Sequence, residues 1–299
     1  MSEQALSVDP LWPRAGDWPP LGPDGADLTI LGIPTHRTSL SPTGAHATPA
    51  AVRQALPRYS AFVPGRAVEA LRFADAGDVH DPDGAEGRER ARAAVAAAAS
   101  VSRLSVAVGG DNSLTVPTML GAAGDALPQA GFITLDAHHD LRDGTSNGSP
   151  VRELLEAGID GRRVVQIGIA DFANSAAYAR RAADHGITVV TRDELHGRPI
   201  DDVMAEALEI AGAGGGPVHV DLDVDVCDRS VAPGCPASVP GGLAAWELRR
   251  FARLAAASPL VRSIDIAEVD ATADTPDQRT VRLAALLILE SAAGLTKRP

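Results

Sequence analysis

The chain is predicted to form a three-layer α/β/α fold around a mostly parallel sheet. Eight short, apolar runs rich in β-branched residues recur at fairly even spacing, and stretches rich in Ala, Leu and Arg lie between most of them. Strands that alternate with helices favour a parallel sheet covered on both faces. Runs that are apolar throughout, rather than at every second position, fit strands that are buried on both sides.

The predicted elements alternate along the chain. Residues 1–27 are rich in Pro, Gly and Asp and are expected to form an irregular leader lying over the body. Residues 28–299 are expected to form a single domain, because no shift in composition marks a linker. The predicted strands are Leu28–Pro34, Arg72–Ala76, Ser105–Val108, Phe132–Leu135, Val164–Ile169, Ile187–Thr191, Val218–Leu222 and Ser263–Ala267. The plainest predicted helices are Glu86–Val101, Ser175–Asp184, Ile200–Ala211, Leu243–Ala256 and Arg279–Ala293.

The composition excludes several classes of function. A formal net charge of −12 and an aromatic content of 3% argue against a nucleic-acid partner, which needs basic side chains and stacking platforms. Lys297 is the only lysine, which excludes a P-loop and a Schiff-base mechanism. Two cysteines, Cys227 and Cys235, exclude a disulfide framework and a Cys₄ zinc site. Neither a bilayer-spanning run nor a signal-peptide pattern is present, so we expect a cytoplasmic location and no membrane partner.

Two acidic clusters point to a metal site. Asp136–Asp140 (Asp-Ala-His-His-Asp) follows the apolar run at 131–135, and Asp221–Asp225 (Asp-Leu-Asp-Val-Asp) follows the run at 217–220. Both clusters are expected at the carboxyl ends of strands, and they can meet only if those strands are neighbours in one sheet. Carboxylates packed together without a cation raise one another's pKa, and oxygen ligands with one or two imidazoles suit Mn²⁺, Mg²⁺ or Zn²⁺. We therefore predict a metal site with two ions.

Simpler structural explanations exist for the individual motifs. The Gly-Gly-Asp-Asn-Ser motif at 109–113 could be only a turn in which Asn or Ser caps the next helix. The second acidic cluster has the look of a solvated acidic turn or an EF-hand loop, but it lacks the Gly and Glu that an EF-hand requires at its sixth and twelfth positions. Alternation along a strand would place Asp221, Asp223 and Asp225 on one face, where they could serve a metal.

The order of these motifs resembles the arginase/agmatinase (ureohydrolase) superfamily. Gly-Gly-Asp-Asn-Ser, Asp-Ala-His-His-Asp, Asp-Val-Asp with Ala-Pro-Gly and Gly-Gly behind it, and Asp-Ile-Ala-Glu-Val follow one another as they do in that family. The resemblance begins near Leu31 and covers most of the chain. It implies a single α/β/α domain with an eight-stranded parallel sheet, two Mn²⁺ ions at the strand ends, and hydrolysis of guanidino or amidino C–N bonds.

The resemblance also assigns metal ligands. Five of the six family ligands match Asp136, His138, Asp140, Asp223 and Asp225. The sixth is a histidine in the family, and Asn112 occupies that position here. An amide oxygen is a weaker donor to Mn²⁺ than an imidazole nitrogen, so one ion is expected to bind loosely, through water or not at all. His139 is expected to point away from the metals and to pack against the loop.

Within the superfamily, the chain resembles formimidoylglutamase. The segment 145–152 lacks the histidine that arginases and agmatinases usually place after the metal loop, and the segment 168–175 with Tyr178 is also similar to that branch. The resemblance implies hydrolysis of N-formimino-L-glutamate to L-glutamate and formamide. In such a site a bridging Mn²⁺ pair lowers the pKa of bound water, so that hydroxide is available at neutral pH.

The remaining site residues follow from the same resemblance. Asp140 would relay the proton of the hydroxide, and Glu268 would pair with the substrate amidinium. The alternative for Glu268 is a surface position at a helix start, which the apolar strand before it disfavours. Arg142, Asn147 and Arg152 are candidates to bind the substrate carboxylates, because bidentate pairing favours arginine. The two cysteines are expected to be packing residues rather than nucleophiles.

Two alternatives to this function stay open. The substrate could be a guanidino compound, as for guanidinobutyrase, agmatinase, arginase or a hydroxyarginine hydrolase. The chain could also be a catalytically silent homologue that has lost one metal through Asn112. Metal content separates these cases, since an enzyme should retain close to two Mn²⁺ per chain. The family usually forms trimers or hexamers, so the resemblance also implies a homo-oligomer.

Overall fold

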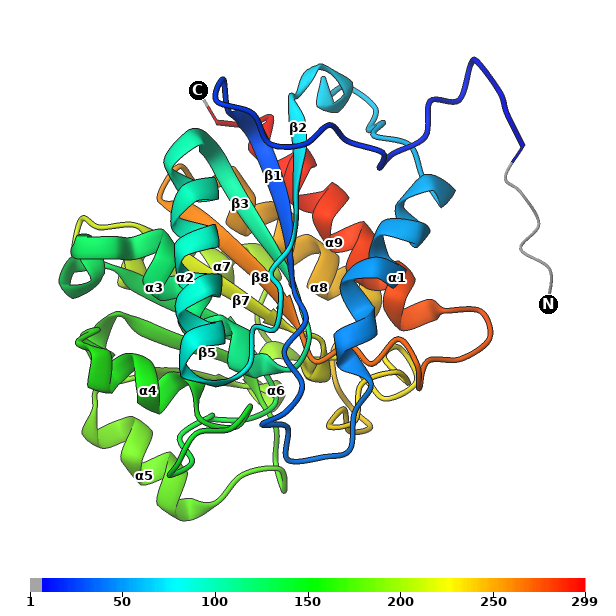
Figure 1. Cartoon of the computed structure of the whole chain (residues 1–299). Helices are drawn as coiled ribbons and strands as arrows, with labels where there is room; N and C mark the ends of the chain where they lie inside the picture. The colour runs from blue at the N-terminus through cyan, green and yellow to red at the C-terminus, as the bar shows by residue number, and fades with distance from the viewer. Residues whose placement is uncertain (1–6, 299) are drawn as a thin grey trace.

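The computed structural model describes residues 7–298 and contains one sheet of eight parallel strands. The strands are β1 (Ala26–Ile33), β2 (Phe73–Asp78), β3 (Ser102–Gly109), β4 (Gly131–Leu135), β5 (Val164–Ile169), β6 (Thr188–Thr191), β7 (Val218–Asp223) and β8 (Val261–Ala267). Their order across the sheet is β2-β1-β3-β8-β7-β4-β5-β6. Because every neighbouring pair is parallel, the carboxyl ends of all these strands lie along one edge of the sheet (Figure 1).

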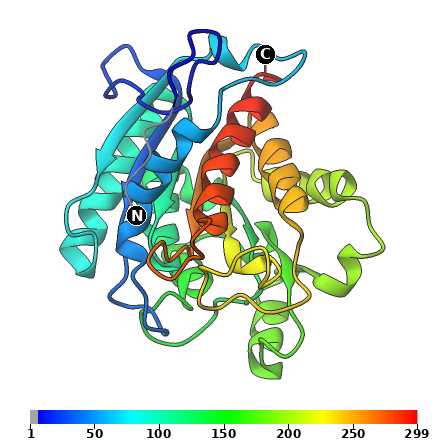
Figure 2. The ribbon, with the colours of Figure 1, turned by 90° about the vertical axis from the view of Figure 1, so that its right-hand side faces the viewer.

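Helices cover both faces of the sheet. The α-helices are α1 (Thr48–Ala55), α2 (Gly84–Val101), α3 (Thr115–Ala123), α4 (Pro150–Ala157), α5 (Ala176–Asp184), α6 (Arg192–Leu195), α7 (Ile200–Gly212), α8 (Ala245–Ala257) and α9 (Arg279–Leu295). Helices α1, α9, α8 and α7 pack against one another on one face, and α2, α3 and α4 pack in sequence on the other (Figure 2). Within residues 7–298, none of the helices has the length and hydropathy that crossing a bilayer requires.

Short 3₁₀ turns connect several of these elements. They are η1 (Ala45–Ala47), η2 (Leu56–Arg58), η3 (Val68–Ala70), η4 (Asn112–Leu114), η5 (Gly124–Gln129), η6 (Gly161–Arg163) and η7 (Val224–Val226). Two of them, η4 and η7, lie at the carboxyl ends of β3 and β7, where the sequence places two of its motifs.

The predicted three-layer α/β/α fold is confirmed. All eight apolar runs are strands, and the five predicted helices correspond to α2, α5, α7, α8 and α9. Helices α1, α3, α4 and α6 have no predicted counterpart. All four are short, and α1, α3 and α4 contain Pro49, Pro117 and Pro150 in their first turn. Proline in a sequence usually signals a helix break, but it is compatible with the first turn, where its missing N–H has no helical partner.

The segment before β1 is irregular where the structure describes it. The first six residues of the predicted leader lie outside the described part of the chain. Residues 7–25 form turns and an isolated bridge between Pro20 and Asp75. Trp18 stacks on Phe73 with the ring centroids 4.6 Å apart, which holds this segment against β2. The division of the chain into a leader and a single domain stays a prediction.

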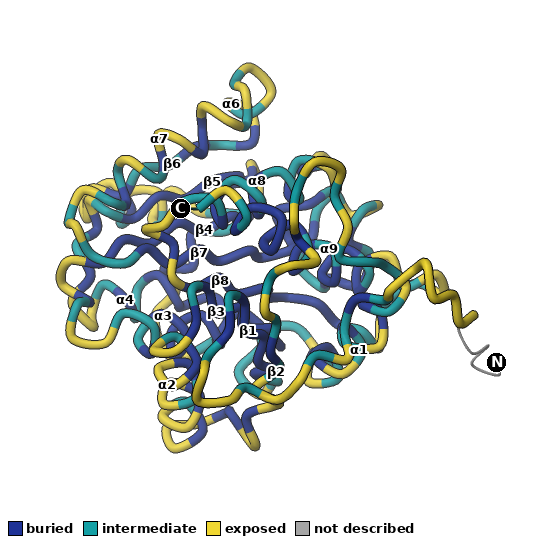
Figure 3. Tube along the Cα trace, turned by 90° about the horizontal axis from the view of Figure 1, so that it is seen from above, coloured by how far each residue is buried: buried dark blue, intermediate teal, exposed yellow. Residues whose placement is uncertain are grey.

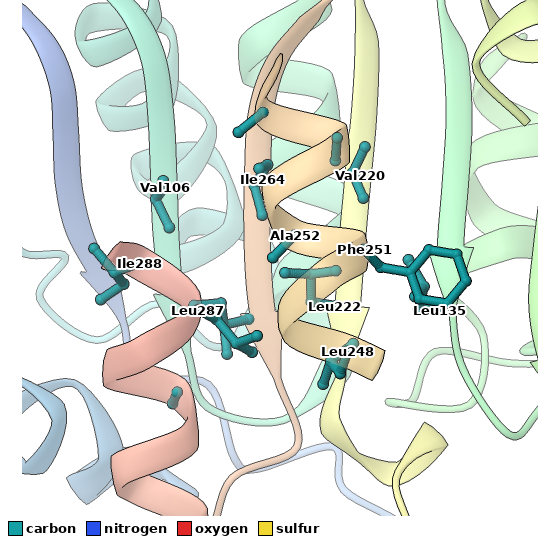
Figure 4. Close-up of a cluster of buried hydrophobic side chains, with 14 of the residues drawn as sticks. Val106, Leu135, Val220, Leu222, Leu248, Phe251, Ala252, Ile264, Leu287 and Ile288 are labelled. Carbon is teal, nitrogen blue, oxygen red and sulfur yellow. The ribbon is translucent and has the colours of Figure 1, made fainter. Parts of the chain in front are cut away.

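The largest hydrophobic core lies between the sheet and the layer of α8 and α9. Leu248, Phe251 and Ala252 of α8 and Leu287 and Ile288 of α9 point toward strands β3, β4, β7 and β8 (Figure 4). The central strands are buried, the edge strands β2 and β6 are partly exposed, and most other exposed residues lie on the outer helices and loops (Figure 3). Burial on both faces explains why the sequences of the central strands are mostly apolar.

The carboxyl ends of β1, β3 and β8 are tied together at a glycine. A Cβ at Gly110 would lie 2.1 Å from the carbonyl oxygen of Thr35, so only glycine allows this approach of the two backbones. Asp111 N donates to Thr35 O at 2.9 Å, and Glu268 N donates to Gly110 O at 2.9 Å. These bonds bring the residue after β8 against the residues after β3.

Candidate metal centre

Asp136 and His138 lie in the loop that leaves β4. Asp136 Oδ1 accepts a hydrogen bond from His138 N at 2.6 Å, which folds the loop back on itself. His138 Nδ1 lies 2.7 Å from Asp225 Oδ2 and 3.4 Å from Asp136 Oδ1. Asp225 Oδ1 accepts from Ala137 N at 2.9 Å. Because β4 and β7 are neighbours, the two acidic clusters meet as the sequence predicts.

Asp223 and Asp225 reach the site from different elements. Asp223 is the last residue of β7, whereas Asp225 lies in the 3₁₀ turn η7. The expectation that strand alternation aligns Asp221, Asp223 and Asp225 is therefore wrong for Asp225. The turn positions it instead, through a bond from Asp225 N to Asp223 Oδ1 at 2.8 Å. Asp221 lies within the sheet, where it accepts from Thr134 Oγ1 at 2.8 Å.

These buried acids have too little positive charge around them. Burial and the nearby Asp225 carboxylate raise the pKa of Asp136 to about 7, and burial raises the pKa values of Asp140 and Asp223 well above the usual range. Burial alone would lower the pKa of His138, but Asp225 and Asp136 raise it to about 12. Ligand atoms of Asp136, His138 and Asp225 all lie within 4.8 Å of one another. Carboxylates with an imidazole at this spacing fit a divalent cation, which would supply the missing charge.

Asn112 contacts one of the predicted ligands. Its Nδ2 donates to Asp140 Oδ2 at 2.7 Å, and its Oδ1 accepts from Thr115 Oγ1 at 2.6 Å. The amide nitrogen thus faces Asp140, while the amide oxygen is occupied by Thr115. Asp111, rather than Asn112 or Ser113, caps the turn, because its Oδ1 accepts from Ser113 N at 3.2 Å. The role of Asn112 as a metal ligand stays a prediction.

Glu268 is buried at the end of β8. It is 4% exposed, so the alternative of a surface position is wrong. Its φ of 62° lies in the left-handed region, which is uncommon for residues other than glycine and is frequently found at functional sites. Its Oε1 accepts from Asn147 Nδ2 and from Asn112 N, both at 2.8 Å. Burial raises the pKa of Glu268 to about 8.

A cavity of about 380 Å³ opens onto this cluster. Its lining includes His138, Asp140, Asp223, Asp225 and Glu268. Arg142 and Asn147 also line it, whereas Arg152 is not among the residues around this cavity. Arg152 Nε donates to Arg142 O at 2.7 Å, and its guanidinium also contacts Gly144 O and the Glu156 carboxylate. Arg152 therefore braces the loop that carries Arg142 and Asn147.

Two amide side chains whose role the sequence did not predict, Gln166 and Asn174, hold the backbone around His138. Gln166 Nε2 donates to His139 O at 2.9 Å, and its Oε1 lies 2.7 Å from His139 Nδ1. Asn174 Oδ1 accepts from His139 N at 2.9 Å, and its Nδ2 donates to Ala137 O at 2.8 Å. His139 is thus buried and hydrogen-bonded, as expected, and it also lines the cavity beside His138. That it points away from the metals stays a prediction. A polar glutamine inside an otherwise apolar strand was the available signal for Gln166.

Both cysteines belong to the hydrophobic core. Cys227 and Cys235 are free thiols, 0% and 1% exposed. Burial raises the pKa of both thiols, which disfavours the thiolate that a nucleophile or a metal ligand requires. Their expected role in packing is confirmed.

Comparison with known proteins places the chain in a family. The Arginase family profile matches residues 26–294. The chain is 34% identical over 290 residues to the formimidoylglutamase of Bacillus subtilis strain 168, a match that spans 92% of this chain and 90% of that protein. The crystal structure of formimidoylglutamase from the same bacterium covers 100% of this chain and 96% of its own, with a TM-score of 0.90 at 31% identity. That of Trypanosoma cruzi formiminoglutamase with Mn²⁺ covers 92% and 95%, with a TM-score of 0.84 at 26% identity. The chain therefore belongs to the arginase family of metal-dependent hydrolases.

Proposed function

We propose that this chain is a formimidoylglutamase, which hydrolyses N-formimino-L-glutamate to L-glutamate and formamide. The observation that carries the proposal is the meeting of predicted metal ligands and Glu268 at one cavity. The formimidoylglutamase relatives support the choice of substrate within the family.

Mn²⁺ is the cofactor we propose, because it is present in the related Trypanosoma cruzi structure and suits carboxylate and imidazole ligands. Asp136, His138 and Asp225 would hold one ion, and Asp140 and Asp223 would contribute to a second. When bound, the metal supplies a Lewis acid that makes water nucleophilic at neutral pH. Two ions per chain, a cytoplasmic location and a trimeric or hexameric assembly are parts of the same proposal.

The chain's own residues would orient the amidine and move its protons. The Glu268 carboxylate would pair with the amidinium group of the substrate. The side-chain amide of Asn147 and the backbone N–H of Asn112 hold that carboxylate in place. A charge-assisted bond of this kind is stronger than a neutral one and fixes the direction of the amidinium. Asp140 would accept the proton of the attacking water at its carboxylate and pass it to the departing nitrogen.

We propose that Arg142 binds the substrate carboxylates. It lines the cavity at an exposed position, and no ion pair or side-chain hydrogen bond of its guanidinium is found within residues 7–298. N-formimino-L-glutamate carries two carboxylates, whereas the floor of the cavity is acidic. A cation near the mouth would therefore orient the anionic end outward and the amidine inward.

Hydrolysis assays with the Mn²⁺-loaded protein test this function. N-formimino-L-glutamate is compared with arginine, agmatine and 4-guanidinobutyrate, and formamide and urea are measured. We expect formamide from the first compound, its loss in Asp140→Ala, and its retention in Asp143→Ala. Asp143 is a matched control because it lies in the same loop but is exposed and pairs with Arg181.

Other results would change the assignment in defined ways. Urea release from a guanidino compound, without formamide release from N-formimino-L-glutamate, would move the substrate to another branch of the family. Turnover of none of the four compounds, with a metal content well below two ions per chain, would favour a catalytically silent homologue.

A further inference from the structure

Arg192 is a buried arginine behind the predicted metal ligands. It is the first residue of α6, directly after β6, and is 9% exposed. Within residues 7–298 its guanidinium forms no ion pair, and all its hydrogen bonds go to backbone carbonyl oxygens. A buried charge without a partner of opposite sign is costly, and burial lowers the pKa of Arg192. The contacts of its guanidinium indicate what this buried charge does.

The guanidinium joins three carbonyl groups, one from the strand β5 and two from the turn η7. Its Nη2 donates to Asp225 O at 3.0 Å and to Val226 O at 3.1 Å, both in the turn η7 that follows β7. Its Nε donates to Gly168 O at 3.2 Å, in β5. Arg192 therefore bridges the end of β5 to the turn that carries a predicted metal ligand.

The backbone around Gly168 is shaped to admit this contact. The register between β5 and β6 shifts between Ile167 and Ile169, and Gly168 has a φ of 98°. A Cβ at Gly168 would lie 2.3 Å from Val226 Cγ2, so glycine allows β5 and η7 to approach closely. The irregular backbone at Gly168 and the side chain of Arg192 thus both contact the turn η7.

Asp225 is held from every side by this arrangement. Its carboxylate contacts Ala137 N and His138 Nδ1, and its backbone N–H donates to Asp223 Oδ1. Its carbonyl group is held by Arg192. Removal of the arginine would take away this donor to Asp225 O, although Val226 O would keep its bond from Leu243 N at 2.9 Å, and would allow the Asp225 carboxylate to move relative to His138. Groups that hold a metal ligand in place typically change metal affinity by about 10–100-fold when they are removed.

We propose that Arg192 is a positioning residue of the metal centre, which sets the orientation of Asp225 by binding the carbonyl groups of Asp225, Val226 and Gly168. The inference rests on the proposed metal-dependent function. The planar guanidinium can donate to three acceptors at once, and a lysine ammonium on a flexible stem cannot reproduce that geometry. The role therefore depends on the shape of the group as well as on its charge.

Arg298 provides a matched control at the opposite end of the sheet. Its guanidinium also donates to three backbone carbonyls, those of Ala256, Arg103 and Val261, at 2.7, 3.0 and 2.8 Å. Val261 is the first residue of β8, so this arginine stabilises the edge of the sheet that lies away from the predicted metal ligands. Replacing Arg298 removes the same chemistry without disturbing Asp225.

The experiment titrates metal-free protein with Mn²⁺ and follows the electron paramagnetic resonance signal of the free ion, which gives the affinity. The Tm of each variant is measured without metal. The variants are Arg192→Lys, Arg192→Met, Arg298→Lys and Arg298→Met. We expect both Arg192 variants to bind Mn²⁺ about 10–100-fold more weakly than the unaltered chain, and both Arg298 variants to stay within about twofold of it. Tm should fall in both pairs, so a general loss of stability cannot produce the difference in Mn²⁺ affinity.

Each contrary result has a distinct meaning. If the unaltered chain binds no Mn²⁺, the proposed function fails. If it binds Mn²⁺ and the Arg192 variants match it, or the Arg298 variants weaken binding equally, the positioning role is overturned. Full affinity in Arg192→Lys with weak binding in Arg192→Met would also overturn it, because charge alone would then suffice. If Arg192→Met does not fold, the folded Arg192→Lys protein, checked by circular dichroism, decides the question.

Discussion

At the scale of single residues, Asn112 is the predicted ligand for which the resemblance to the arginase family implies a histidine. Its amide nitrogen faces Asp140 at 2.7 Å, and Thr115 occupies its oxygen. In this arrangement Asn112 orders a neighbouring carboxylate through a hydrogen bond. A histidine at the same place would present an imidazole nitrogen instead, which is a stronger donor to Mn²⁺.

We expect Asn112→His to strengthen Mn²⁺ binding by about tenfold or more, since it adds an imidazole to the donor set. The measurement is a titration of metal-free protein with Mn²⁺, which gives both affinity and the number of ions. Thr115→Val is the control, because it removes the hydrogen bond to Asn112 and adds no ligand. Unchanged affinity in Asn112→His would show that this side chain does not approach a metal.

Glu268 should matter for catalysis and not for metal binding. Truncating one partner of a buried charged pair typically costs 2–5 kcal/mol, so Glu268→Gln should lower kcat/KM for N-formimino-L-glutamate by about 30-fold or more. Mn²⁺ affinity and Tm serve as the controls and should change little, because glutamine can still accept from Asn147 and Asn112. Activity equal to that of the unaltered chain would remove Glu268 from the proposed site.

At the scale of elements, the loop between β4 and α4 depends on a residue outside the cavity. Arg152 lies on α4 and donates to the carbonyl groups of Arg142 and Gly144. The loop from 141 to 149 carries both Arg142 and Asn147, so its conformation determines where these side chains stand. Arg152 was predicted to bind substrate, and its position favours a bracing role instead.

We expect Arg152→Ala to raise KM for N-formimino-L-glutamate several-fold, with a smaller change in kcat, because the loop becomes less ordered before substrate binds. Steady-state kinetics provide the measurement. Arg162→Ala is the matched control, since Arg162 is an exposed arginine whose guanidinium, among the described residues 7–298, pairs with Asp160 alone. A fall in kcat with an unchanged KM would point to a different role for Arg152.

At the scale of the whole molecule, the buried acids make stability depend on pH and metal. Without metal, the folded state raises the pKa of Asp136 to about 7 and that of Glu268 to about 8. At a pH between the ordinary carboxyl pKa and these raised values, the folded chain binds more protons than the unfolded chain. The free energy of unfolding therefore falls as pH rises.

We accordingly expect Tm of the metal-free protein to fall by about 5 °C or more between about pH 5 and about pH 8. Mn²⁺ should raise Tm most at the upper end of this range, because it balances the ionised carboxylates there. Differential scanning calorimetry with and without chelator checks both statements. If the Tm of the metal-free protein rises with pH instead, burial and mutual repulsion do not raise the pKa values of these carboxyl groups.

The sequence by itself determined the fold class and the strands, because a strand buried on both faces is apolar along most of its length, as at Phe132–Leu135. It also placed Asp136, His138, Asp140, Asp223 and Asp225 correctly at the ends of two adjacent strands. Motifs of this kind are continuous in sequence, so their chemistry can be read from neighbouring residues.

Tertiary structure alone decided the contacts between residues far apart in the chain. Examples are the bonds of Asn174 to Ala137 and His139, those of Arg152 to the loop before α4, and those of Arg192 to Gly168 and Asp225. Each of them joins different segments of the chain. A side chain that donates to a backbone carbonyl leaves no mark on the sequence of its partner, because every residue has a carbonyl group. Only the packing of the layers determines which carbonyl lies within reach.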